Sequence, residues 1–176
     1  MLWNHPDNGD VAARWQAKPP QTRGHDLSDV LFYHLTETPL EAALPPLLER
    51  SIAREWTIRL RGQNPDRLDF LDRHLWTFAD DSFLPHGRAG GAHDAVQPIL
   101  LTDTDQNAND ADVLMLIDGA MEDVAGFAGY ERVCVLFDGN DPDATATARS
   151  HWKTIQAAGH SCKYWAQEGG RWQQKS

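Results

Sequence analysis

A group of acidic and histidine side chains within fifteen residues is the part of this sequence best suited to catalytic chemistry. Its members are Asp80, Asp81, His86, His93 and Asp94. Carboxylates and imidazoles of this kind hold the metal ions of many hydrolases. No HExxH, DxD or CxxC spacing organises them, however, and they occupy a glycine-rich stretch, where such side chains are usually solvated. A small metal- or nucleotide-dependent hydrolase that uses the His86/His93 loop is therefore kept as the alternative to the binding function argued below.

Nucleotide-binding and nucleophile motifs have less support. The turn after the first expected strand, Thr36-Glu37-Thr38-Pro39, has no glycine, so a phosphate would meet a carboxylate there rather than free backbone N–H groups. The stretch 87–91 (GRAGG) matches neither GxGxxG nor GxxxxGK[ST], and no GxSxG turn is present. We expect no catalytic residue, no metal and no cofactor.

Binding chemistry is better supported, near the C-terminus. The formal net charge is −10, and a chain this acidic is poorly suited to bind nucleic acid by itself, because duplex affinity comes largely from neutralised phosphates. Residues 149–176 nevertheless carry five basic side chains against one acidic side chain. A local basic patch on an acidic protein suits an acidic peptide.

The last expected helix carries the first residues of this basic segment. Asp141-Pro142-Asp143 is a strong helix start, and Gly159 stands where a C-terminal cap would be. Arg149 and Lys153 are one helical turn apart and should project together, with Trp152 beside them. The inward face should consist of Ala144, Ala148 and Ile155. The two cations are therefore expected on the rim and the indole at the core boundary.

Strands alternate with helices along the rest of the chain, which indicates one Rossmann-like α/β domain with a largely parallel sheet, spanning 28–176. A helix should follow a capping box in which Thr38 is the N-cap and Pro39 the first helical residue, and should run to about Glu55. Pro45 and Pro46 should kink or restart it. The expected strands are 30–35, 57–61, 98–101, 113–117, 133–137 and 161–165.

A second helix should begin at Asn64-Pro65-Asp66, with an N-cap amide and a proline at N1. Trp76 lies roughly a quarter turn away from the apolar stripe of this helix. An off-stripe tryptophan near Phe83 of the following loop is a reasonable interface anchor, although core packing is the commoner fate of aromatic residues. The stripe itself consists of Leu68, Leu71 and Leu75.

Residues 1–27 show no sustained periodicity and are expected to be a disordered leader. Cys134 and Cys162 lie in apolar runs, as buried reduced thiols do. No apolar run approaches the ~18 residues of a membrane span, and the first twenty residues lack a signal-peptide core. We expect a cytoplasmic protein without a membrane partner.

Three segments resemble the chi subunit of bacterial DNA polymerase III holoenzymes. The first is Asp29-Val30-Leu31-Phe32-Tyr33-His34-Leu35, and the most specific is Leu75-Trp76-Thr77-Phe78 followed by Asp81-Ser82-Phe83-Leu84-Pro85-His86-Gly87. The third is Ala148-Arg149-Ser150-His151-Trp152-Lys153, leading to Ala158-Gly159. Glu55 departs from the pattern, since a glycine is common at that position of the family.

The resemblance implies a Rossmann-like, non-catalytic subunit of a DNA-directed DNA polymerase complex that acts in DNA replication. Chi proteins bind the acidic C-terminal tail of single-stranded DNA-binding protein and pair with the psi subunit, which tethers them to the clamp loader. By resemblance, Arg149, Trp152 and Lys153 belong to the tail-binding region. Trp76 and Phe83 belong to the psi surface. Contact with nucleic acid would be indirect, and a repair helicase is a further partner that the sequence leaves open.

Overall fold

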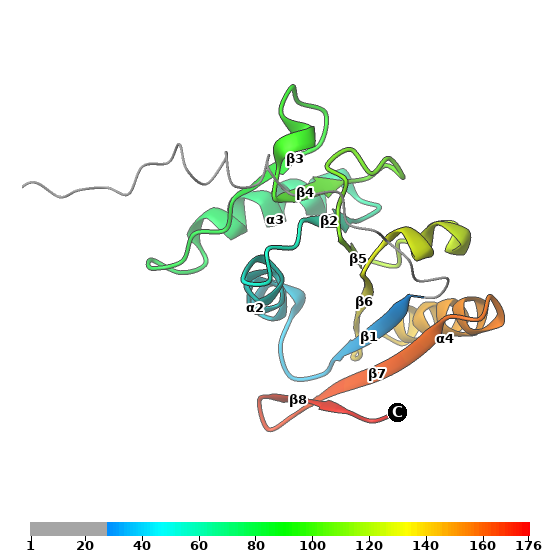
Figure 1. Ribbon diagram of the computed structural model, residues 1–176. Coiled ribbons are helices and arrows are strands. Elements are labelled where there is room, and N and C mark those ends of the chain that lie inside the picture. The colour runs from blue at the N-terminus through cyan, green and yellow to red at the C-terminus, as the bar shows by residue number, and fades with distance from the viewer. Residues whose placement is uncertain (1–27) are drawn as a thin grey trace, which may run out of the picture.

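The computed structural model describes residues 28–176, so the leader expected over 1–27 lies outside the described part of the chain. A single eight-stranded sheet runs through the described residues in the order β3-β4-β2-β5-β6-β1-β7-β8 (Figure 1). All its ladders are parallel except that between β7 and β8. The strands are β1 (Asp29–Leu35), β2 (Ile58–Arg61), β3 (His86–Arg88), β4 (Ile99–Thr102), β5 (Val113–Leu116), β6 (Arg132–Asp138), β7 (Ser161–Glu168) and β8 (Arg171–Gln174).

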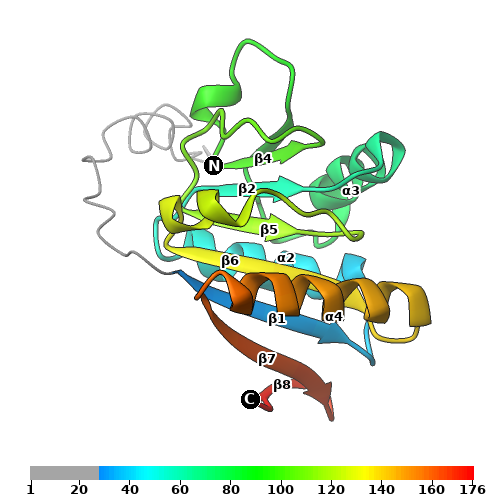
Figure 2. The ribbon, with the colours of Figure 1, turned by 90° about the vertical axis from the view of Figure 1, so that its right-hand side faces the viewer.

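Helices cover the two faces of the sheet, as Figure 2 shows for α4 in front of the central strands and α2 behind them. The helices are α2 (Leu40–Ile52), α3 (Pro65–Thr77) and α4 (Pro142–Ala157), with two 3-10 segments, η1 (Asp94–Val96) and η2 (Val124–Gly129). The fold is therefore the predicted α/β, Rossmann-like domain with a largely parallel sheet. None of the described helices is both long enough and apolar enough to cross a membrane.

Strand alternation divides the core into two layers, because successive side chains of a strand point to opposite faces. On β1, Leu31 and Tyr33 pack with α2 and α3 in one layer. Val30 and Phe32 pack with η2 and α4 in the other layer. The strands were predicted from continuous apolar runs, which is the pattern of parallel strands buried on both faces.

The start of α2 differs from the prediction. Pro39 is the N-cap and makes no side-chain capping bond, so the expected capping box with Thr38 as N-cap is wrong. The amide of Gln167 on β7 instead holds the turn that precedes the helix. Its Oε1 accepts hydrogen bonds from the backbone N–H groups of Thr36, Glu37 and Thr38 at 3.1–3.2 Å. Its Nε2 also donates to Thr38 Oγ1, so a partner distant in sequence uses the oxygen that was expected to cap the helix.

Pro45 and Pro46 lie inside one uninterrupted helix, so α2 does not restart there. Pro45 cannot donate the helical bond to the Glu41 carbonyl. His74 of α3 compensates, because its Nε2 lies 2.9 Å from that oxygen. The helix ends at Ile52, a few residues before the expected Glu55, and Glu55 has a φ of +61°. That left-handed conformation explains why glycine is favoured at this position.

Two of the three helix starts and one helix end were predicted from local residues. The Asn64 side chain caps α3 by accepting from Asp66 N at 3.0 Å, and Asp141 caps α4 by accepting from Asp143 N at 2.8 Å. Gly159 follows α4 with a φ of +92°. The apolar stripe of α3 is buried as expected and consists of Leu68, Leu71 and Leu75.

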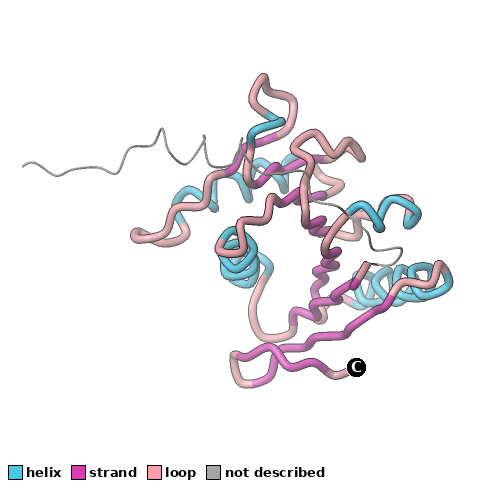
Figure 3. The backbone as a smooth tube through the Cα atoms, in the orientation of Figure 1, coloured by secondary structure: helices cyan, strands magenta, loops and turns pink. Residues whose placement is uncertain are grey.

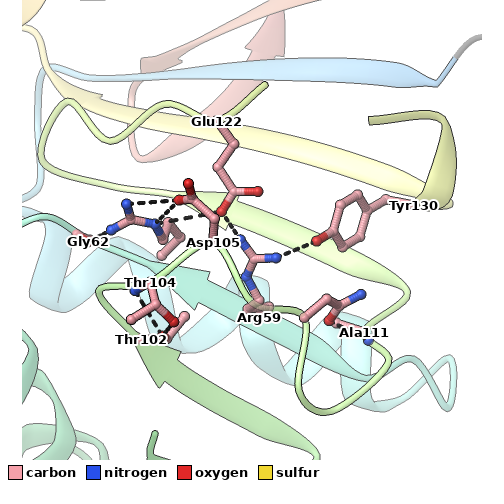
Figure 4. Close-up of polar contacts among 10 residues, drawn as sticks. Arg59, Gly62, Thr102, Thr104, Asp105, Ala111, Glu122 and Tyr130 are labelled. Carbon is pink, nitrogen blue, oxygen red and sulfur yellow. Dashed lines mark hydrogen bonds and ion pairs between the residues drawn. The ribbon is translucent and has the colours of Figure 1, made fainter. Parts of the chain in front are cut away.

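Loops cover β2 on the same side of the sheet as α4. A buried arginine of β2 holds these loops, in place of an apolar contact (Figure 4). Arg59 is 1% exposed, donates from Nη1 to the Tyr130 hydroxyl at 2.6 Å and forms an ion pair with Glu122. Burial is the main reason that the Arg59 pKa lies below its usual value. Arg61 extends the network to Asp105 at 3.0 Å. These loops, visible in Figure 3, are thereby held by charge.

Candidate binding sites

Helix α4 presents the three predicted tail-binding residues at one edge of the sheet. Arg149 and Lys153 are exposed and Trp152 is half-buried, while Ala148 and Ile155 are buried beneath them. This is the arrangement expected from the helical period, except that Ala144 is only partly buried. The structure therefore brings the three side chains together.

A cavity of about 340 Å³ opens beside these residues and is called the α4 pocket below. Arg149, Trp152 and Lys153 line its helical side. Its other walls come mainly from aromatic residues of β1, β6 and β7 (Phe32, His34, Phe137 and Tyr164), and Ser176 after β8 completes them. Sequence reasoning treated these strand residues only as core. Alternation places them on the α4 face, but only the assembled sheet brings them to one cavity.

Ring contacts hold the walls of the α4 pocket in place. Trp152 packs edge-on against Phe32 with the ring centroids 5.0 Å apart, and His34 stacks on Phe137 at 4.9 Å. The His34 Nδ1 atom is also hydrogen-bonded to the Tyr164 hydroxyl. Gly139 makes room for this histidine, since a Cβ there would lie 2.0 Å from His34 Nε2. The pocket is therefore preformed rather than loosely packed.

The electrostatics of the α4 pocket favour an anion. Burial raises the pKa of Tyr164, and the positive charges of Arg149 and Lys175 oppose that rise. Lys175 is paired with Glu168. Within residues 28–176, neither Arg149 nor Lys153 takes part in an ion pair. Both cations are thus available to a ligand.

The second predicted surface is a protruding aromatic pair, called the Trp76 surface below. Trp76 at the end of α3 is 53% exposed, and Phe83 in the next loop is 64% exposed. Their rings lie 5.9 Å apart, and Trp76 also contacts the His86 ring at 4.5 Å. His86 Nδ1 lies 2.6 Å from the Leu84 carbonyl oxygen and its Nε2 2.9 Å from that of Asp72. The aromatic pair therefore rests on a fixed base.

The same contacts bear on the hydrolase alternative. Each ring nitrogen of His86 faces a backbone carbonyl oxygen, so the position that a metal ion would take beside either nitrogen is already filled. His93 is exposed in the glycine-rich stretch. Over the described residues, no group of three or more potential metal ligands comes together. The geometry of His86 therefore favours a structural role for this residue.

A family model described as "DNA polymerase III chi subunit, HolC" matches residues 27–163. The chain belongs to the chi subunit family. Chi is a non-catalytic accessory subunit of DNA polymerase III, which agrees with the expectation of no intrinsic activity. The matched range contains α4 and its three pocket residues as well as the Trp76 surface. It ends before most of β7 and all of β8.

A curated relative supports the same family. It is the "Probable DNA polymerase III subunit chi" of Rickettsia prowazekii (strain Madrid E), which is 31% identical over 85 residues. The aligned region covers 48% of this chain and 52% of the relative. The chain therefore spans about half the length of this curated relative. Both comparisons indicate an accessory role in DNA replication.

Proposed function

We propose that this chain links the clamp loader, through a psi subunit, to the acidic C-terminal tail of single-stranded DNA-binding protein. The observation that carries the proposal is the α4 pocket. It combines a preformed aromatic cavity with two cations that have no ion-pair partner in the described structure. Such a cavity suits an acidic peptide that ends in a hydrophobic residue and a carboxylate.

The two kinds of wall would hold different parts of the peptide. The hydrophobic end residue would pack against Trp152 and Phe32, where burial of an aromatic ring contributes about 1.5–3 kcal/mol. Carboxylates would meet Arg149 and Lys153, and a charge-assisted hydrogen bond contributes about 1.5–3 kcal/mol. The chain as a whole is acidic, with a net charge of −10, so attraction of an acidic peptide depends on local basic patches such as this one.

The Trp76 surface would meet psi. Large aromatic residues that are well exposed and rigidly supported are typical anchors of protein interfaces. Trp76 and Phe83 satisfy both conditions through their exposure and through the contact of Trp76 with His86. This surface lies on α3 and its following loop, whereas the α4 pocket lies at the far end of the sheet order, by β1 and β7. One chain could hold both partners at once.

The peptide test uses a synthetic acidic tail and the full chain. Arg149→Ala and Lys153→Ala should each weaken binding about tenfold, with little change in the unfolding midpoint, because both side chains are exposed. Arg73→Ala, which removes an exposed cation on α3, is the matched control and should change affinity less than twofold. Isothermal titration calorimetry measures all three variants.

Salt provides a second readout. Affinity should fall as ionic strength rises, since screening over ~10 Å at 0.1 M weakens attraction between exposed charges. If the affinity were independent of salt and unchanged by Arg149→Ala, the α4 pocket would not be the site at which the peptide binds.

The psi surface is tested by Phe83→Ala. The variant should fold normally, because the ring is 64% exposed, and should lose most of its binding to purified psi in a pull-down. Phe70→Ala changes another exposed aromatic of α3, on a different face, and should leave binding intact. Equal loss in both variants, or severe destabilisation of the Phe83 variant, would contradict this assignment.

A further inference from the structure

A second cavity lies on the opposite face of the strands that line the α4 pocket. It has a volume of about 330 Å³ and is called the α2 pocket here. Its walls come from α2 and the turn that follows it, from β1, β6 and β7, and from β8. In Figures 1 and 2, α2 lies across the sheet from α4, so the two pockets open on different sides of the molecule.

The α2 pocket gathers positive charge from one helix, the turn that follows it and two strands. Arg50 comes from α2 and Arg54 from the turn after it, Arg132 from β6 and Lys163 from β7. Lys163 is paired with Asp29 at 2.6 Å. The three arginines have no ion-pair partner among residues 28–176. A site with three uncompensated guanidinium groups carries more positive charge than one carboxylate would neutralise.

Two of the three arginines are held by an aromatic ring instead of by acids. The guanidinium carbons of Arg54 and Arg132 lie 5.0 and 5.1 Å from the ring centroid of Trp56. Cation–π contact of this kind orients a guanidinium group while leaving its N–H donors in the plane free for a ligand. The N–H forks are therefore positioned before any anion arrives.

Two buried donors also lack an acceptor. Within the described structure, neither Arg132 Nε nor Trp165 Nε1 has a hydrogen-bond partner, and both atoms are inaccessible to solvent. Buried donors are nearly always satisfied in native proteins, so each unsatisfied one requires an explanation. Both side chains line the α2 pocket, so acceptor oxygens of a ligand reach these two donors only if the pocket walls shift.

Aromatic side chains complete the walls. Trp172 of β8 packs edge-on against Tyr33 of β1 with the ring centroids 4.9 Å apart, and Trp165 of β7 lies beside them. All three rings are on the α2 side of the sheet. Planar apolar surfaces next to guanidinium groups are the elements with which proteins hold the bases and phosphates of single strands.

We propose that the α2 pocket binds a nucleoside phosphate, as one unit of a single-stranded nucleic acid. The phosphate would accept from the guanidinium forks, whose geometry matches phosphate oxygens in a bidentate way. The base would lie against the tryptophan side of the cavity. The volume lies within the range of ~300–1,000 Å³ that small-ligand pockets occupy. The chain would then contact the strand directly, whereas the sequence predicted indirect contact alone.

The experiment measures fluorescence anisotropy of a labelled oligo(dT) of about twelve nucleotides with the full chain at low salt. Arg50→Glu/Arg54→Glu should weaken binding at least about tenfold. Arg73→Glu/Arg171→Glu makes the same change in net charge at two exposed cations that line neither pocket, and should weaken binding less than about threefold. If the first variant does not fold, Arg50→Gln/Arg54→Gln replaces it, with the same expected direction. Unlabelled thymidine monophosphate should compete, and failure to compete would overturn the single-unit site.

Other results would also overturn the proposal. Equal losses of affinity in the two charge-reversed variants would show only a general charge effect. If the unaltered chain did not bind the oligonucleotide, the α2 pocket would not be a nucleic-acid site. Displacement of the oligonucleotide by the acidic peptide would place both in one pocket. Peptide binding measured in parallel with Arg149→Ala reports on the α4 pocket alone, so the two proposals fail independently.

Discussion

The α4 and α2 pockets have nearly the same volume, about 340 and 330 Å³, and share strands β1, β6 and β7 as their common wall. Adjacent residues of one strand contribute to different pockets. On β7, Tyr164 lines the α4 pocket, and Lys163 and Trp165 line the α2 pocket. The two-residue period of a strand therefore separates two binding surfaces of different chemistry.

The chemistry differs because different elements supply the charge. Both cations of the α4 pocket come from one helix, one turn apart, and the remaining wall is largely aromatic. The cations of the α2 pocket come from α2, the turn after it, β6 and β7, and two of them, Arg54 and Arg132, lie against Trp56. A concentrated apolar wall suits a hydrophobic peptide end, whereas distributed guanidinium groups suit a polyanion.

The largest effects should come from the neighbouring β7 residues. Tyr164→Ala should weaken binding of the acidic peptide roughly thirtyfold, about 2 kcal/mol, and leave oligo(dT) binding unchanged. Trp165→Ala should weaken oligo(dT) binding and leave peptide binding unchanged. Both ligands are titrated against both variants by anisotropy, after thermal melts show that each variant folds. Loss of the same ligand in both variants would show that the strand does not separate the two surfaces.

A smaller effect is expected at Gly139. An added Cβ would lie 2.0 Å from His34 Nε2 and 3.0 Å from the Leu35 carbonyl oxygen, so Gly139→Ala must displace the His34 ring. We expect destabilisation of about 1–2 kcal/mol and a several-fold weaker peptide complex, with the α2 pocket unaffected. Gly126→Ala is the control, because nothing lies within 4 Å of its Cβ position. Chemical denaturation and calorimetry measure the two quantities. A Gly139→Ala variant that melts and binds like the Gly126→Ala control would show that His34 does not shape the pocket.

A third expected difference concerns the two thiols, one on each face. Burial raises the pKa of Cys134, in the α2-face core, to about 12, and that of Cys162, on the α4 face, to about 11. Both are protonated at pH 8, so alkylation should be slow and should accelerate about tenfold per pH unit. Cys162 should react first, by roughly tenfold. Mass spectrometry of iodoacetamide-treated protein gives both rates, and faster labelling of Cys134 would contradict the burial of the α2-face core.

Sequence reasoning recovered the features that depend on neighbouring residues. The Asn64 and Asp141 caps act within three residues of themselves, and the exposure of Arg149 and Lys153 follows from the helical period. Two short strands were not predicted, because so few residues show little periodicity. β3 covers three residues, and β8 becomes a strand only by pairing with β7.

The sequence by itself thus determined the α/β class, the main elements and the cationic face of α4, since each follows from local propensity and period. Only the tertiary structure decided which distant side chains meet. Gln167 of β7 binds the turn before α2 and the Thr38 hydroxyl, and His74 of α3 lies within hydrogen-bond distance of the carbonyl oxygen that Pro45 leaves free. The α2 pocket likewise joins residues from both ends of the described chain, from Asp29 to Gln174. Such contacts depend on sheet order and strand register, which parallel crossover connections set over long separations and which no local pattern encodes.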